Sequence, residues 1–190
     1  MSTHELAASV RRLIDATIRT EADAATVAAA KDKIDAATAQ LSGTLMPGSF
    51  GVQSTPDGQS IAWGNVVVGL RNPVAPPLVI QNDGHGAVHT DFALGAAYEG
   101  PPGHVHGGVC ALILDHVLGA TAHRPGKPAY TGTLTLRYLR GTPLGQPLRA
   151  QARVDRVDRA KTFAVGHIAD ADGVTVQAEG VFIHPREARQ

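Results

Sequence analysis

The sequence predicts an α+β domain in which an antiparallel β-sheet wraps around one long central helix, with a helical extension at the N-terminus. Two observations carry this prediction. Residues 109–123 are apolar over most of a helical circumference, as in a buried helix. The segments around that stretch alternate apolar and polar residues with period two, as in half-buried strands. We expect residues 1–60 to form the extension and a Gly- and Pro-rich linker, and residues 61–190 to form the domain that contains the sheet.

The N-terminal segment is expected to form two helices. Leu6, Val10 and Leu13 recur at three- and four-residue spacing, which is the pattern of an amphipathic helix. The alanine-rich residues from about 22 to 41 predict the second helix. Gly, Pro and Ser then become frequent, interrupted by residues 61–70, whose sequence IAWGNVVVGL is compatible with a short strand.

Five strands are expected in the domain, one before the buried helix and four after it. Alternation places the first within residues 86–99, the next within 130–139 and the third within 147–157. Residues 162–183 predict two strands joined around Asp172–Gly173, because Asp-Gly is a strong hairpin signal. Consecutive strands linked by short turns favour an antiparallel sheet.

The composition excludes several functional classes. The 17 basic and 17 acidic residues give a formal net charge of zero, so the chain lacks the positive charge that nucleic-acid binding requires. No apolar run reaches the roughly 18 residues that cross a bilayer, and the N-terminus lacks the apolar core of a signal peptide. We therefore expect a cytoplasmic protein without a membrane partner. The single cysteine, Cys110, lies in an apolar run and is expected to be a small buried residue.

The stretch GPPGHVHGGVCALILDH, residues 100–116, contains the side chains of a metal site. The ligands of a zinc ion must converge within about 2 Å of the metal. His104 and His106 can share one face of an extended segment, but Asp115 and His116 lie inside the predicted helix, about 12 Å further along. We therefore expect no metal and no other cofactor.

Gly107 and Gly108 stand where the predicted buried helix begins. The first N–H groups of a helix are unpaired and carry partial positive charge, so they can polarise a carbonyl group. A glycine pair alone is more typical of a tight turn. Asp115, however, lies in the wall of the same helix, where a carboxylate is costly unless it is paired or functional. An N–H donor and a carboxylate are the parts of a carbonyl hydrolase.

Gly107 and Asp115 cannot act together within one chain. Eight residues of helix separate them by about 12 Å, whereas groups that act on one carbonyl lie near 3 Å from it. We therefore expect a homodimer in which the two helices pack antiparallel about a two-fold axis. Each site then takes Gly107 from one copy and Asp115 from the other.

The segment HGGVCALILDHVLG, followed by TGTLTLRYLRGTPLG, resembles the hot-dog-fold acyl-CoA thioesterases of the phenylacetate-pathway (PaaI) type. The shared pattern is His-Gly-Gly, an Asp nine residues after the His, and a hydroxyl residue seven positions before a Tyr. The resemblance covers roughly residues 65–183. It implies the hot-dog fold, in which a sheet wraps around one long helix and two copies form a continuous sheet.

The resemblance implies a role for each matching residue. The backbone N–H of Gly107 would stabilise the oxyanion, and Asp115 of the second copy would act as general base or nucleophile. His106 would order the substrate carbonyl and its loop. Thr131 would orient the attacking water or the aspartate.

Two positions depart from patterns within that family. Gly100 stands where one branch has an asparagine that contacts the site, and His116 stands where many members have glutamate. Both departures bear on substrate preference. Contacts to an anionic acyl-CoA are expected from Gly108, Arg137, Arg140 and Lys161, although each of the three cations is more typical of a plain exposed strand face.

The resemblance implies hydrolysis of an acyl-CoA, or a related thioester, by a homodimer or a dimer of dimers. One alternative is a non-catalytic module that binds acyl-CoA, which the presence of both Asp115 and Thr131 disfavours. The other is a hot-dog hydratase acting on enoyl-CoA. That class uses an aspartate and a histidine in a loop before the helix, whereas the aspartate here lies within it.

Overall fold

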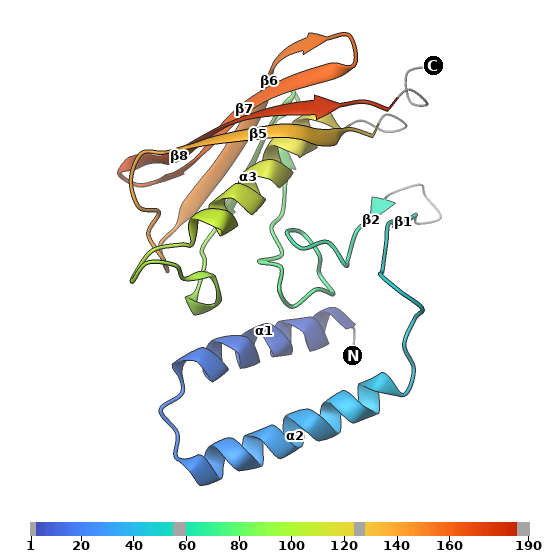
Figure 1. Cartoon of the computed structure of the whole chain (residues 1–190), viewed down its shortest axis with the longest axis vertical. Coiled ribbons are helices and arrows are strands. Elements are labelled where there is room, and N and C mark those ends of the chain that lie inside the picture. Colours follow the sequence, from blue (N-terminus) through green and yellow to red (C-terminus); the bar gives the residue numbers. More distant parts are fainter. Residues whose placement is uncertain (1–2, 55–59, 124–127, 186–190) are drawn as a thin grey trace. The chain divides into compact units, whose positions relative to one another are not determined.

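In the computed structural model of the chain, a six-stranded antiparallel sheet curves around one helix (Figure 1). The structure describes residues 3–54, 60–123 and 128–185. The chain forms two compact units. The first comprises Met1–Asn65 and Gly69–Val74, and the second, which holds the sheet, comprises Val66–Val68 and Ala75–Gln190.

The strands of the sheet follow the order β3-β4-β6-β7-β8-β5, and all neighbours are antiparallel. β5 precedes β6 in the chain but pairs with β8, so it forms one edge of the sheet. The predicted antiparallel sheet is therefore confirmed. The strands are β3 (Gln81–Asn82), β4 (Ala87–Phe92), β5 (Tyr130–Tyr138), β6 (Leu148–Asp158), β7 (Lys161–Asp170) and β8 (Gly173–Ile183).

The alternation in β6 sets the two faces of the sheet. Leu148, Ala150 and Ala152 are buried in the core, whereas Arg149, Gln151 and Arg153 between them are exposed. The first three lie on the side of the central helix, which we call the inner face. The other three lie on the opposite side, the outer face.

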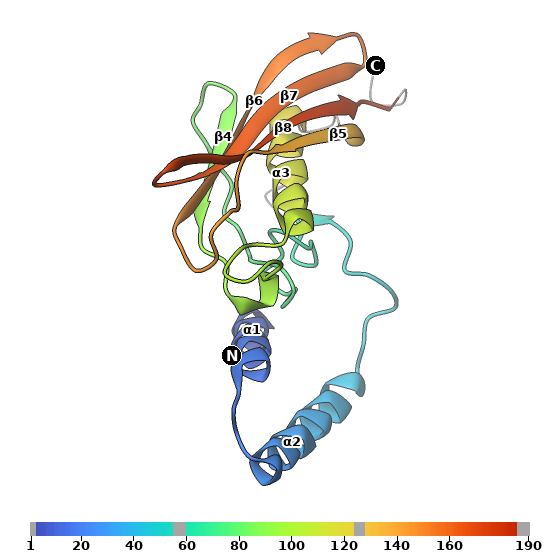
Figure 2. The same cartoon turned by 60° about the vertical axis from the view of Figure 1, so that its left-hand side comes forward.

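The central helix is α3 (Gly107–Ala122), which crosses the inner face (Figure 2). It begins two residues before the apolar pattern, and the predicted buried helix is confirmed. A Cβ atom on Gly166 of β7 would lie 2.9 Å from Cδ1 of Leu118, so this glycine lets the helix approach the sheet closely. Four side chains of the helix have an exposed fraction of 0%: Ile113, Leu114, Val117 and Leu118.

The hairpin between β7 and β8 turns at the position predicted from the sequence. Asp170 pairs with Gly173, and Gly173 has a φ of 116°. Glycine adopts this backbone conformation without the strain that a Cβ atom causes. The prediction of a hairpin around Asp172–Gly173 is therefore confirmed.

The strand expected over residues 61–70 is wrong for most of its length. Only Ile61 belongs to a strand, and turns follow it. The backbone N–H of Asn65 donates to the carbonyl of Ala62 at 2.9 Å, and that of Gly69 donates to the carbonyl of Asn65 at 3.0 Å. These turns place Val67 in the core of the second unit, so its apolar character reflects burial in a loop rather than in a sheet.

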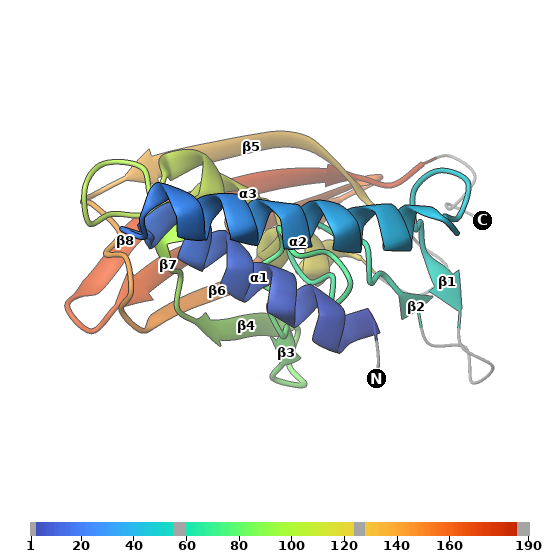
Figure 3. The same ribbon diagram turned by 90° about the horizontal axis from the view of Figure 1, so that it is seen from below.

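The first unit contains the two predicted helices, α1 (Thr3–Arg19) and α2 (Ala24–Ser42), which run in opposite directions (Figure 3). Asp23 begins α2, because its carboxylate accepts the N–H of Thr26 at 2.7 Å. A small pair of strands follows, β1 (Gln53–Ser54) and β2 (Ser60–Ile61). Within the described parts of the chain, no helix is long and apolar enough to span a membrane.

Candidate functional site

The start of α3 is fixed by His106. Its backbone is extended, and its Nδ1 atom accepts the N–H of Gly108 at 3.0 Å, so the imidazole caps the helix. Because Nδ1 accepts, a neutral ring carries its proton on Nε2, where it can donate to a ligand. His106 is exposed and therefore accessible.

The two glycines after His106 differ in what their N–H groups do. The N–H of Gly108 is occupied by the His106 ring. The N–H of Gly107 donates no hydrogen bond to any described residue. A free N–H at the first position of a sixteen-residue helix is suited to donate to an oxyanion.

Tyr138 binds the backbone carbonyl group of Gly107. Its hydroxyl donates to the carbonyl oxygen of Gly107 at 2.9 Å, and a Cβ atom on Gly107 would lie 3.4 Å from its ring. Burial raises the pKa of the Tyr138 phenol, and the nearby Cys110 adds to the effect. The phenol therefore stays protonated and keeps donating.

Asp115 lies two turns further along α3 and is half-buried. Its Oδ1 atom accepts the hydroxyl of Thr131 in β5 at 2.8 Å. The structure thus brings together two of the residues that the sequence pattern selected. The carboxylate is oriented by this bond, while its second oxygen has no partner among the described residues.

An extra residue in β5 explains how Thr131 reaches Asp115. Thr131 pairs with Phe182 and Thr133 pairs with Val181, so Gly132 is left over as a bulge. Phe182 is buried on the inner face, and Thr131 opposite it shares that face. Without the bulge, strict alternation would place Thr131 on the outer face with Thr133.

The helix between the two functional groups is unbroken. Gly107 and Asp115 lie on the same α-helix, eight residues apart, which corresponds to about 12 Å. The structure therefore keeps the N–H donor and the carboxylate of one chain too far apart to act on the same carbonyl.

Two further residues of α3 have perturbed acidity. Burial lowers the pKa of His116, an effect that the neighbouring Asp115 partly offsets. Burial raises the pKa of the Cys110 thiol, whose sulfur donates to the hydroxyl of Thr142 at 3.6 Å. Cys110 is 2% exposed, which agrees with the predicted small buried residue.

Gly100, one of the two departures from the family pattern, packs directly against His106. A Cβ atom on Gly100 would lie 2.7 Å from the Cα atom of His106. An asparagine at this position therefore requires the backbone to shift. The absence of a side chain at Gly100 therefore leaves room for His106, the residue that caps α3.

The cations expected to contact substrate do not gather around Asp115. Arg140 forms an ion pair with Asp170 and also donates to the carbonyl of Gly173 at 2.8 Å. This pairing, above all the hydrogen bond from Arg140, lowers the pKa of Asp170 to about 2. Arg137 stands opposite Gln177 on the outer face of the sheet, and Lys161 is exposed at the start of β7.

The histidines near the helix start make other contacts. The Nδ1 atom of His104 lies 2.9 Å from the carbonyl oxygen of Pro102, and that of His106 caps α3. Over residues 3–54, 60–123 and 128–185, no group of three or more His, Cys, Asp or Glu side chains is placed to hold a metal ion.

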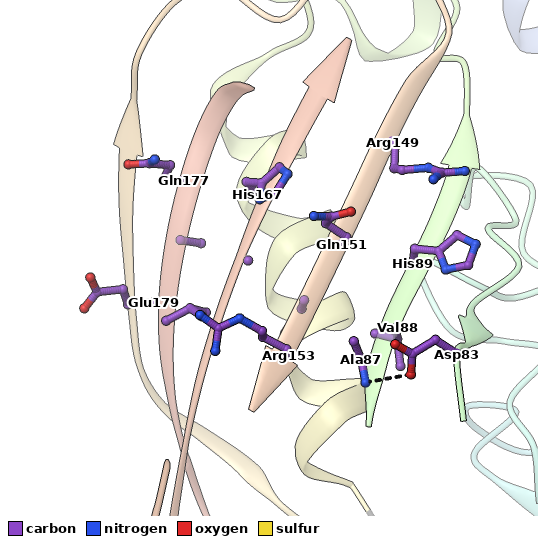
Figure 4. Close-up of a pocket in the computed structure, with 14 residues that line it drawn as sticks. Asp83, Ala87, Val88, His89, Arg149, Gln151, Arg153, His167, Gln177 and Glu179 are labelled. Carbon is purple, nitrogen blue, oxygen red and sulfur yellow. Dashed lines mark hydrogen bonds between the residues drawn. The ribbon is translucent and has the colours of Figure 1, made fainter. Parts of the chain in front are cut away.

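A groove of about 740 Å³ lies over the outer face of the sheet (Figure 4). Its walls come from β4, β6, β7 and β8, including His89, Gln151, His167 and Gln177. None of the predicted catalytic residues lines it. The alternation in β6 predicts a polar face, but the groove depends on which strands are neighbours, and no local pattern predicts that.

Comparison with known proteins points to one family. The family described as Thioesterase superfamily matches residues 102–177, which include Gly107, Asp115 and Thr131. The crystal structure of protein RHA08564, a thioesterase superfamily protein, is similar over 96% of this chain and 91% of that chain, with 34% identity and a TM-score of 0.86.

Two other proteins are similar over part of the chain. Human acyl-coenzyme A thioesterase THEM5 is 29% identical over 94 residues, which are 48% of this chain and 38% of the human protein. This chain thus spans well under half the length of that relative. The PaaI protein from the phenylacetic acid degradation operon of E. coli has a TM-score of 0.54 over 58% of this chain and 80% of that chain. At 17% identity this second similarity concerns the fold alone.

Proposed function

Because this chain belongs to the thioesterase superfamily, we propose that it hydrolyses the thioester of an acyl-CoA to a free acid and a thiol. The same similarity confirms the predicted hot-dog fold. The acyl-CoA class is supported by the human relative, which is an acyl-coenzyme A thioesterase. Since this chain covers 38% of that protein, its activity and substrate are part of the proposal.

The observation that carries the proposal is the unpaired N–H of Gly107 at the start of α3. A thioester carbonyl placed against it accepts this hydrogen bond, and the bond strengthens as negative charge develops on the oxygen. His106 directly precedes Gly107, and its Nε2 proton helps to order the same carbonyl. Gly108 carries no side chain that would block the approach.

Asp115 of a second copy supplies the attacking group in this proposal. As a general base it takes a proton from water while the water oxygen attacks the carbonyl carbon. The tetrahedral intermediate then collapses, the C–S bond breaks, and the thiolate leaves with the proton. As a nucleophile, Asp115 instead attacks the carbonyl carbon, the C–S bond breaks and the thiolate leaves, which gives an anhydride between Asp115 and the acyl group. Water then hydrolyses the anhydride to the free acid and the Asp115 carboxylate, and the proton that this releases goes to the thiolate. Thr131 orients the carboxylate in either case.

The free edge of β5 supports the sharing of the site between copies. Among the described residues, β5 pairs with β8 on one side and with no strand on the other. Pairing of two β5 edges about a two-fold axis joins the sheets and brings the two α3 helices together antiparallel. Each helix start then meets the middle of the other helix.

The rest of the proposal concerns the CoA portion and the place of action. Arg137, Arg140 and Lys161 are proposed to attract its phosphates. Their positions away from Asp115 are compatible with this, because the nucleotide end of an acyl-CoA is remote from its carbonyl. We propose that the protein acts in the cytoplasm.

Replacement of Asp115 tests the proposed function. Asp115→Asn keeps the size of the side chain but removes its basicity, so thiol release from a panel of acyl-CoA substrates should fall by about 10²- to 10⁴-fold. Asp32→Asn makes the same change at an exposed position of α2 and should leave turnover unchanged. Equal turnover of wild type and Asp115→Asn contradicts the proposal. Tight binding of acyl-CoA without thiol release identifies a binding module, and hydration of enoyl-CoA identifies a hydratase.

A further inference from the structure

The peptide group between Gly107 and Gly108 takes part in two side-chain hydrogen bonds. Its carbonyl oxygen, which belongs to Gly107, accepts the hydroxyl of Tyr138 at 2.9 Å. Its N–H, which belongs to Gly108, donates to Nδ1 of His106 at 3.0 Å. A phenol and an imidazole that lie far apart in the sequence are thus joined through a single peptide group.

The end of β5 fixes the position of Tyr138. This residue is the last of the strand and pairs with Val176 of β8, which is buried in the core. Directly after it, the N–H of Leu139 donates to the carbonyl of Thr175 at 2.9 Å. Because paired residues of neighbouring strands share a face, Tyr138 lies on the inner face, on the side of α3. Its hydroxyl therefore reaches the helix start from a strand end that is held by the core.

The two hydrogen bonds of this peptide group strengthen each other. A donor at the carbonyl oxygen draws electron density away from the peptide nitrogen, so the N–H becomes a better donor. Hydrogen bonds linked in this way gain about 10–30% in strength. The N–H of Gly108 therefore donates more strongly to His106 than it would without the Tyr138 hydroxyl.

The strength of the donor at Nδ1 decides where the imidazole of His106 carries its proton. A neutral imidazole has one N–H and one acceptor nitrogen, and a donor held at Nδ1 keeps the proton on Nε2. Only in this tautomer can Nε2 donate to a ligand. The side chain of His106 is exposed, so a ligand can reach it.

We propose that Tyr138 is a positioning residue that acts through the Gly107–Gly108 peptide group and keeps the proton of His106 on Nε2. This inference rests on the proposed function, in which that proton helps to order the thioester carbonyl. Tyr138 itself needs no contact with the substrate. The two ends of β5 then orient different groups of the site. Thr131 orients Asp115, and the hydroxyl at the other end orients the imidazole.

A purely structural contact is the alternative, since the Tyr138 ring also packs against Gly107. A Cβ atom on this glycine would lie 3.4 Å from the ring. Tyr138→Phe separates the two roles because it keeps the ring and removes only the hydroxyl. Tyr130→Phe makes the same change at the other end of β5, where the side chain is 65% exposed, and serves as the matched control.

NMR of the ligand-free protein tests the tautomer without any substrate. Spectra of protein containing ¹⁵N-labelled histidine are recorded at about pH 8.5, where an ordinary imidazole is neutral. The signals of His106 are those that disappear in His106→Ser. The proton should lie on Nε2 in the wild type and in Tyr130→Phe, whereas Tyr138→Phe should contain a fraction of His106 with the proton on Nδ1. Identical His106 spectra for the wild type and Tyr138→Phe overturn the proposal.

The kinetics of a double variant test whether the hydroxyl acts through His106. Tyr138→Phe should lower kcat by about 3- to 10-fold with little change in KM, because one neutral hydrogen bond is lost. His106→Ser keeps an oxygen that can cap α3 but has no imidazole, so Tyr138→Phe should have little further effect in that background. An equal fall in both backgrounds means that the hydroxyl acts on the helix start itself, and it overturns the proposal.

The two measurements also separate this inference from the proposed function. A wild type that hydrolyses no acyl-CoA contradicts the proposed function, and the NMR spectra then decide by themselves whether Tyr138 sets the tautomer of His106. A wild type that hydrolyses acyl-CoA, but whose His106 signals do not respond to Tyr138→Phe, overturns this inference alone.

Discussion

The hydroxyl of Thr131 donates to Oδ1 of Asp115 at 2.8 Å because β5 contains one extra residue, Gly132. A strand without this bulge would direct Thr131 away from α3. Gly132 also has little room for a side chain, since a Cβ atom there would lie 2.7 Å from Cδ1 of Ile183. The orientation of the carboxylate therefore depends on a local irregularity of the edge strand.

Removal of the Thr131 hydroxyl should impair turnover more than substrate binding. Thr131→Val keeps the shape but leaves Asp115 without its donor, and loss of a hydrogen bond to a charged group corresponds to about a 10- to 100-fold fall in kcat. Thr131→Ser keeps the hydroxyl and should retain most activity. Steady-state kinetics on one acyl-CoA measure both. Equal kcat values for the two variants would show that the hydrogen bond has no part in the reaction.

The oxyanion role of Gly107 can be tested by removing its N–H. Proline is well tolerated at the first position of a helix, and the extended backbone of His106, with ψ of 133°, suits a residue that precedes proline. Gly107→Pro should therefore fold but lose about 10²- to 10³-fold in kcat. Gly107→Ala keeps the N–H and serves as the matched control, so a fall of the same size in both variants would contradict the role. Circular dichroism confirms that both variants are folded before the rates are compared.

Mixed dimers test whether the site is shared between copies. Asp115→Asn and Gly107→Pro are each expected to be inactive alone. A mixed dimer contains one site with an intact Gly107 and an intact Asp115, so refolding the two variants together should restore activity toward one good site per mixed dimer. If mixtures stay as inactive as their components while mixed dimers are present, both groups of a site come from the same chain.

The ion pair between Arg140 and Asp170 should make stability depend on acid. The pKa of Asp170 is lowered from 3.8 to about 2, first by the hydrogen bond from Arg140. A lowered pKa in the folded state stabilises the protein above pH 4, and this contribution is lost as the pH falls from about 4 to 2. Asp170→Asn should therefore unfold at a lower temperature than wild type at pH 6, and the difference should shrink below pH 4. Thermal melts at several pH values measure it, and a constant difference would contradict the assignment.

The close packing of α3 on the sheet predicts a large effect of one core substitution. Leu118 is fully buried and packs against Gly166 and Gly180, so Leu118→Ala should lower the free energy of unfolding by about 2–5 kcal/mol. Val79 is 67% exposed, and Val79→Ala should change it by no more than about 0.5 kcal/mol. Urea unfolding compares the two. Similar effects would mean that Leu118 is not part of the tightly packed core.

Much of the fold was predictable because the burial of one face leaves a period in the sequence. The apolar run predicted α3, alternation predicted β6, and Asp172–Gly173 predicted the last hairpin. Residues 61–70 misled the prediction because Val67 enters the core from turns that are held by local hydrogen bonds, whereas Val66 stays exposed. An apolar run of this length does not distinguish a strand from a buried loop.

The amino-acid sequence alone determines which reactive groups the candidate site contains and how far apart two of them lie. The spacing of Gly107 and Asp115, together with the constant rise of a helix, separates the two groups within one chain whatever else the fold does. Three further features come from the folded chain: His106 occupies the N–H of Gly108 and leaves that of Gly107 free, Thr131 turns toward Asp115, and Arg140 is engaged by Asp170. The last two rest on pairings between segments far apart in the sequence, such as β5 with β8, and no local period encodes which strands become neighbours.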